Sequence, residues 1–137
     1  MSKRQKNILR CLGALVLGAI LYILFRKNTW VAHLFDGIGF VRCLRSMVQS
    51  ISLNWLRFYV PDLLWAFALS CGIQAICVPK RGGVPACALS AFICGLVWEF
   101  LQWSHVVSGT GDLWDVLMYL TGSVLSILIN IKGEKRT

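Results

Sequence analysis

The sequence is poor in charged side chains and especially in acidic ones. Only 15% of the 137 residues are charged, with six Asp or Glu against 14 Lys or Arg. With 57% apolar residues and a mean hydropathy of +0.67, this composition is typical of an integral membrane protein. The basic residues lie at the ends of apolar runs and not over a soluble face, so no nucleic-acid partner is expected.

The sequence also lacks the signatures of common catalytic and metal sites. It has no HExxH or CxxC pattern, no nucleophile elbow and no phosphatase-type histidine. Its six cysteines fall mostly inside apolar runs, where a thiol behaves as a small hydrophobic group. Neither a disulfide framework nor a zinc site is predicted. We expect no cofactor, with a divalent metal ion as the alternative that the acidic residues described below leave open.

Four apolar runs predict four membrane-spanning helices, over residues 9–25, 61–78, 85–103 and 113–131. The first run has basic residues on both sides and no small-residue cleavage site, which indicates a retained span and not a cleaved signal. The predicted fold class is therefore an all-α integral membrane bundle. The whole chain, 1–137, is expected to form a single domain.

The segment between the first two predicted spans is too polar to cross a membrane. Within it Phe40, Leu44, Val48, Ile51 and Trp55 recur at helical spacing, with polar residues elsewhere on the wheel. This pattern indicates an amphipathic helix. It suits a helix that lies in the membrane interface, and equally one that packs against the spans.

The distribution of basic residues predicts the topology. With the N-terminus inside, nine Lys or Arg lie on the cytoplasmic side and five outside. The loop 104–112 has no Lys or Arg, which also favours an outer position for it. We therefore expect a multi-pass protein of a bacterial cytoplasmic membrane with both termini cytoplasmic.

Acidic and amide side chains gather where three predicted spans reach the outer surface. Asp62 begins the second span, Glu99 and Gln102 end the third, and Asp112 and Asp115 begin the fourth. An ionisable side chain inside a membrane costs a few kcal/mol, at about 2.5 to 3.5 on insertion scales, so such groups normally face a bundle interior or a cavity. The sequence thus predicts an acidic pocket at this end of the bundle.

Two helical stripes connect this pocket to the packing below it. One stripe runs through Ala88, Ala91, Gly95, Glu99 and Gln102, and the other through Asp112, Asp115, Tyr119, Gly122 and Ser126. The small residues lie toward the cytoplasm, so we expect the third and fourth spans to approach through Ala91, Gly95, Gly122 and Ser126.

Each polar residue also has a simpler structural interpretation. Asp112 can cap the fourth helix and Asp115 can interact with its dipole. Asp62 can serve only as an acid at a helix start, and Glu99 as a hydrogen-bonded structural carboxyl. His105 is either a general base or ligand of the pocket or a plain interfacial histidine. The tryptophans near this surface fit the aromatic belt of a membrane protein, and they are Trp98, Trp103 and Trp114.

The last third to half of the chain resembles the VanZ-like family of small bacterial membrane proteins. The resemblance is carried by Glu99-x-x-Gln102, a polar loop and Asp115-x-x-x-Tyr119-x-x-Gly122. It implies that Glu99, Gln102, Asp115 and Gly122 are the family's motif positions, and that the chain has a cell-envelope setting. The family is named for a teicoplanin resistance factor.

Two positions depart from the family's pattern. The family often has an arginine in the loop where this chain has Ser104 and His105, and commonly an asparagine where this chain has Tyr119. A mechanism that needs a fixed cation near the acids would then use another residue. Arg57, at the outer end of the second span, is the candidate replacement.

These observations favour a pocket that recognises a membrane lipid head group, a lipid-linked envelope precursor or a lipoglycopeptide antibiotic. Glycopeptide resistance is the implied phenotype. One alternative is a membrane enzyme that acts on a lipid-linked phosphate or glycosyl group through the carboxylates, with Mg²⁺ or Zn²⁺. Another is a small proton-coupled transporter subunit that uses the same acids. The sequence leaves oligomerisation open.

Overall fold

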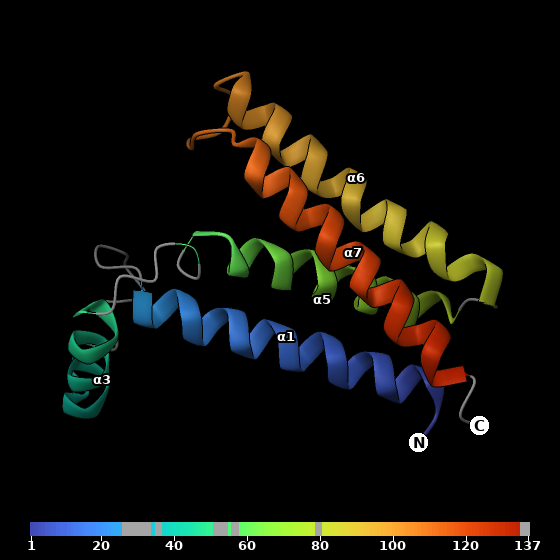
Figure 1. The fold of residues 1–137 in the computed structure, drawn as a ribbon, viewed down its shortest axis with the longest axis horizontal. Helices are drawn as coiled ribbons and strands as arrows, with labels where there is room; N and C mark the ends of the chain where they lie inside the picture. Colours follow the sequence, from blue (N-terminus) through green and yellow to red (C-terminus); the bar gives the residue numbers. More distant parts are fainter. Residues whose placement is uncertain (26–33, 35–36, 51–54, 56–57, 79–80, 135–137) are drawn as a thin grey trace.

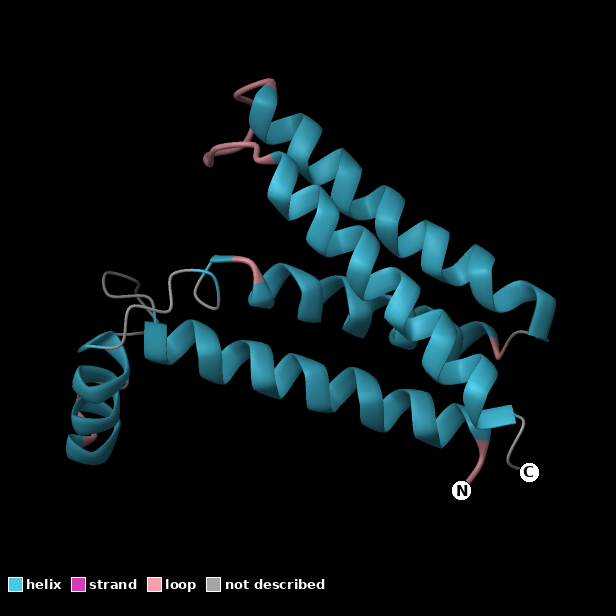
Figure 2. Cartoon of the chain, viewed as in Figure 1, coloured by secondary structure: helices cyan, strands magenta, loops and turns pink. Residues whose placement is uncertain are grey.

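The computed structural model describes residues 1–25, 34, 37–50, 55, 58–78 and 81–134, and within these ranges it contains helices and no strand (Figure 1 and Figure 2). The helices are α1 (Lys3–Phe25), α3 (Gly39–Ser50), α5 (Val60–Cys77), α6 (Val84–Trp103) and α7 (Leu113–Glu134), with a 3₁₀ turn η1 (Arg81–Gly83) before α6. Four of them, α1, α5, α6 and α7, are long and apolar enough to cross a membrane. The prediction of an all-α, multi-span membrane protein is confirmed at this level.

Local sequence explains where the spans begin. α1 starts at Lys3 and not at residue 9, because Ser2 and Gln5 form a capping box. The Ser2 hydroxyl accepts from the Gln5 backbone N–H at 3.2 Å, and the Gln5 side chain accepts from the Ser2 N–H at 2.8 Å. Pro61 and Pro85 lie in the first turns of α5 and α6, where a missing N–H leaves no helical hydrogen bond unmade.

α5 is the central helix of the bundle. It packs along α1 and also contacts α6 and α7, while α7 lies beside α6 (Figure 1). The two chain termini lie at one end of the bundle, and the loop that joins α6 to α7 lies at the other (Figure 1). The start of α5, the end of α6 and the start of α7 are therefore at the same end, opposite the termini.

Two glycines allow close approach to two different neighbours. A Cβ at Gly95 would lie 2.5 Å from a ring carbon of Tyr119, so α6 packs here directly against the α7 tyrosine. A Cβ at Gly122 would overlap the Leu63 carbonyl oxygen, and its other near neighbours, the Phe67 nitrogen and the Ala66 Cβ, also belong to α5. The predicted approach of Gly122 to the third span is therefore wrong, because this face of α7 contacts α5.

A buried polar network joins α7 to α5 and α1 in the half of the bundle near the termini. The hydroxyls of Ser70 and Ser126 are hydrogen-bonded, and the Gln74 amide donates to both, at 3.1 and 3.2 Å. Asn130 donates to the Gln74 side-chain oxygen at 2.6 Å and accepts from Arg10 at 2.8 Å. Ser126, predicted as a small residue facing the third span, thus bonds to α5.

α3 lies crosswise at the end of α1 (Figure 1). Arg45 of α3 is only 8% exposed, and its guanidinium donates to the Ile23 carbonyl of α1 at 2.9 and 3.1 Å. An arginine on the last carbonyls of a helix satisfies groups that have no partner within the helix. α3 ends at Ser50, and residues 51–54 of the predicted amphipathic helix lie outside the described residues.

Candidate functional site

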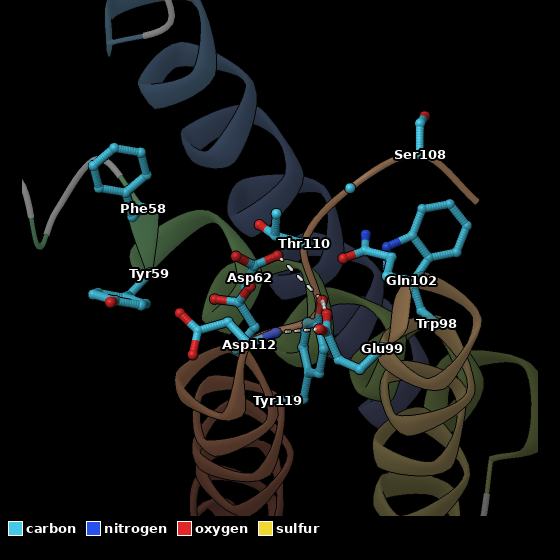
Figure 3. Close-up of a pocket in the computed structure, with 12 residues that line it drawn as sticks. Phe58, Tyr59, Asp62, Trp98, Glu99, Gln102, Ser108, Thr110, Asp112 and Tyr119 are labelled. Atoms are coloured by element: carbon cyan, nitrogen blue, oxygen red, sulfur yellow. Dashed lines mark hydrogen bonds between the residues drawn. The ribbon is translucent and has the colours of Figure 1, made fainter. Parts of the chain in front are cut away.

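The end of the bundle opposite the termini contains a pocket of about 510 Å³ between α5, α6, α7 and the loop after α6. Its lining residues are Phe58, Tyr59, Asp62, Trp98, Glu99, Gln102, Ser108, Gly109, Thr110, Asp112, Asp115 and Tyr119. The carboxylates of Asp62, Asp112 and Glu99 gather near Tyr119, with Gln102 and Trp98 to one side (Figure 3). Four of the chain's six acidic residues thus line one pocket.

Glu99 is a buried clamp between α6 and the start of α7. Its side chain is only 1% exposed. One carboxylate oxygen accepts the Tyr119 hydroxyl proton at 3.0 Å, and the other accepts the Asp112 backbone N–H at 3.0 Å. Both oxygens therefore hold protein donors, which supports the structural interpretation of this residue. Glu99 positions Tyr119 and the beginning of α7.

The two aspartates at the start of α7 have different surroundings. The Asp112 side chain accepts from the Trp114 backbone N–H at 3.0 Å, which is a helix cap. Asp115 is half-buried in the first turn and lines the pocket. Within the described part of the chain, its carboxylate has no hydrogen-bond partner. Asp115 is thus the carboxylate that the fold leaves open to a ligand.

Tyr119 connects the carboxylates of two helices. Its hydroxyl lies 3.0 Å from Glu99 and 3.4 Å from Asp62. It is 3% exposed, and its ring contacts Trp65 edge to face with centroids 5.7 Å apart. A phenol has one proton to donate, so it satisfies one of these two carboxylates fully and the other only in part.

The loop after α6 is folded onto the pocket by Gln102 and two glycines. The Gln102 amide accepts from the Trp98 indole N–H at 2.8 Å and donates to the Thr110 carbonyl at 3.2 Å. Gly109 has a φ of +148° and packs against Gln102, and a Cβ at Gly111 would overlap the Trp103 ring. Gln102 therefore fixes both the Trp98 ring and the loop that covers it.

Two predicted site residues are not brought into the pocket. His105 is exposed and does not line it. Its backbone has φ +56° and donates to the Gln102 carbonyl at 3.0 Å, while Val106 donates to Leu101 at 3.0 Å. These are the two bonds of a Schellman motif, so His105 ends α6. The prediction that it belongs to the pocket is corrected. Arg57 lies outside the described residues.

The aromatic lining was missed from the sequence, where Trp98 was assigned to the interfacial belt. Trp98 lines the main pocket and also an adjoining cavity of about 300 Å³, whose other lining residues are Asp62, Trp65 and Tyr119. The spacing contained a signal for this. Trp98 precedes Gln102 by four positions, and Trp65 follows Asp62 by three, so each shares a helix face with a predicted site residue.

Among the described residues, no group of three or more His, Cys, Asp or Glu side chains is arranged to hold a metal ion. The four carboxylates line a common pocket without forming a coordination cluster. The site therefore offers no preformed set of ligands for Mg²⁺ or Zn²⁺ in this part of the chain.

Comparison of the chain with family models, with curated proteins and with solved structures finds no match. The likeness to VanZ-like proteins accordingly stands on its motif positions alone. Three of these, Glu99, Gln102 and Asp115, line the pocket. The fourth, Gly122, lies at the contact between α7 and α5.

Proposed function

We propose that this chain is a VanZ-like cell-envelope protein of a bacterial cytoplasmic membrane. Its acidic pocket recognises a lipid head group, a lipid-linked envelope precursor or a lipoglycopeptide antibiotic, and resistance to teicoplanin-type glycopeptides is the associated phenotype. One observation carries the proposal: Asp115 lines the pocket and, among the described residues, lacks a hydrogen-bond partner. A charged group in a membrane helix is costly, and a ligand that pairs with it accounts for its presence.

The surroundings of the pocket support recognition rather than packing as its role. Glu99, Gln102 and the Asp112 cap hold the neighbouring helix ends in place by hydrogen bonds within the protein. The volume of about 510 Å³ is within the range of small-molecule sites. The fold thus holds a preformed space beside an available carboxylate, and such preorganisation lowers the entropic cost of binding.

In the proposed topology both termini are cytoplasmic and the pocket opens to the outer leaflet. α3 lies in the membrane interface, which its exposed Phe40 and Met47, at 75% and 63%, support. The position of both termini at one end of the bundle is compatible with this topology (Figure 1). Association of several copies is compatible with the apolar outer faces of the spans.

The topology can be tested by cysteine labelling in intact cells. We expect Ser108→Cys, in a variant whose native cysteines are replaced, to react with a membrane-impermeant maleimide added from outside, because Ser108 is exposed on the α6–α7 loop. A reporter fused at Thr137 should behave as cytoplasmic. Labelling only after the cells are opened would place the pocket in the other leaflet and overturn this topology.

The function can be tested by comparing two aspartates that are three positions apart. We expect Asp115→Asn to lose the teicoplanin resistance that the parent confers on a susceptible bacterium, because the amide keeps the shape but removes the charge. Asp112→Asn should retain it, since asparagine caps a helix about as well as aspartate. Both variants should accumulate in the membrane and melt in detergent like the parent. Resistance that persists in Asp115→Asn would contradict the proposal.

A further inference from the structure

The charge of the pocket limits the chemistry of its ligand. Among the described residues, every charged side chain that lines it is acidic, and no Lys, Arg or His contributes. The whole chain, by contrast, has 14 Lys or Arg against six acids. The negative charge is therefore a local property of this site. A phosphate or carboxylate of a ligand would be repelled here, and a cation would be attracted.

A second, independent feature is the aromatic cavity beside the acids. It has a volume of about 300 Å³ and is lined by Asp62, Trp65, Trp98 and Tyr119. Three aromatic rings and one carboxylate around a cavity form the kind of site that binds organic ammonium ions, because the cation interacts with the faces of the rings. A bare metal ion needs neither the rings nor this volume.

The hydrogen bonds of Tyr119 indicate which kind of ammonium fits. Its single hydroxyl proton lies between Glu99 and Asp62, at 3.0 and 3.4 Å. A primary ammonium group in the adjoining cavity would supply three further N–H donors to these carboxylates, and such charge-assisted hydrogen bonds are the stronger kind. A quaternary ammonium has no N–H and would leave this need unmet.

An apolar pocket continues from the aromatic cavity toward α1. It has a volume of about 230 Å³, lies between α1 and α5, and shares Trp65 with the aromatic cavity. Gly18 and Pro61 are among its other lining residues. A hydrocarbon chain attached to the ammonium head would therefore have an apolar surface beside the head-group site.

We propose that the pocket binds an amphiphile whose head carries a primary ammonium group. The ammonium lies among the rings of Trp65, Trp98 and Tyr119. The carboxylates of Asp62 and Asp115 neutralise its charge, and the hydrocarbon part follows the apolar pocket between α1 and α5. This inference rests on the proposed function and deepens it, because it assigns the charge and the donor groups of the ligand.

The test uses two lipids that differ only in the head group. Phosphatidylethanolamine and phosphatidylglycerol with identical acyl chains share the phosphate, but only the first has an ammonium. The purified full-length protein is delipidated, incubated with an equimolar mixture and analysed by native mass spectrometry. We expect phosphatidylethanolamine to be retained about tenfold more than phosphatidylglycerol, as one or two desolvated cation contacts would give.

Variants and a soluble competitor assign the preference to the pocket. Asp62→Asn and Asp115→Asn should each reduce it, whereas Glu134→Gln, at the other end of α7, should not. Because an aspartate variant can fail to fold, free ethanolamine is also added to the parent protein. Displacement of bound phosphatidylethanolamine by ethanolamine, but not by glycerol, supports head-group recognition. Failure of ethanolamine to displace the lipid contradicts it.

The outcomes separate this inference from the proposed function. Equal retention of the two lipids, or preference for phosphatidylglycerol, with a dependence on Asp115 would overturn the ammonium assignment and leave a lipid-binding pocket. Retention of both lipids that no pocket variant alters, together with full resistance in Asp115→Asn, would overturn the proposed function and this inference with it.

Discussion

Replacing Gly122 by alanine should destabilise the protein more than any other single methyl group added to a span. The new Cβ would overlap the Leu63 carbonyl oxygen and lie 3.0 Å from the Phe67 nitrogen. Both atoms belong to the α5 backbone, which cannot turn away as a side chain can. Overpacking of this kind costs about 1 to 3 kcal/mol, and we expect a clear fall in the melting temperature of the detergent-solubilised protein.

A second glycine provides a matched control with the opposite sign. Gly13 lies in α1, and a Cβ there would have no neighbour within 4 Å. Gly13→Ala should leave the melting temperature unchanged or raise it, because alanine is favoured over glycine in a helix by about 1 kcal/mol. Equal melting temperatures for Gly122→Ala and Gly13→Ala would contradict the close contact between α7 and α5.

Glu99→Ala should produce the second large effect, on stability. The change removes the acceptor of the Tyr119 hydroxyl and of the Asp112 backbone N–H, and it leaves space in the bundle. A buried donor without a partner costs about 1 to 3 kcal/mol, so the two together should lower the free energy of unfolding by several kcal/mol. Thermal unfolding in detergent measures this loss.

Glu99→Gln is the control for the role of the clamp. The amide keeps one oxygen for one of the two donors but presents its NH₂ to the other, so its stability should be intermediate. Hydrogen exchange at the Asp112 amide should become faster in Glu99→Ala, since that N–H loses its acceptor. A variant with parental stability and parental exchange at Asp112 would show that Glu99 does not hold α7.

The composition and the helical period predict much of this molecule. Apolar runs bounded by basic residues locate the spans, and a period of 3.6 places Glu99 and Asp115 on buried stripes. The start of α1 was predicted too late. The charges of its first turn obscured the capping box of Ser2 and Gln5, although that motif is visible in the sequence.

The partners of each face are harder to predict than the face itself. Periodicity assigns Gly122 and Ser126 to a buried stripe of α7 but does not say whether α5 or α6 lies opposite. The same limit applies to Glu99, whose acceptor oxygens bind a loop N–H and a tyrosine from another helix. His105 failed as a site residue because its left-handed backbone serves to end α6.

The polar network below the pocket has a consequence for biogenesis. Arg10 and Gln74 lie in the first two spans, but both bond to Asn130, in the last. During synthesis these two side chains enter the membrane before their partner has been translated. Polar groups without partners in a bilayer are costly, and they favour water, chaperones or other helices until the partner arrives. Insertion of α7 is therefore the step that completes the hydrogen bonds of α1 and α5, and a nascent chain halted before residue 130 retains exposed polar groups within its first two spans.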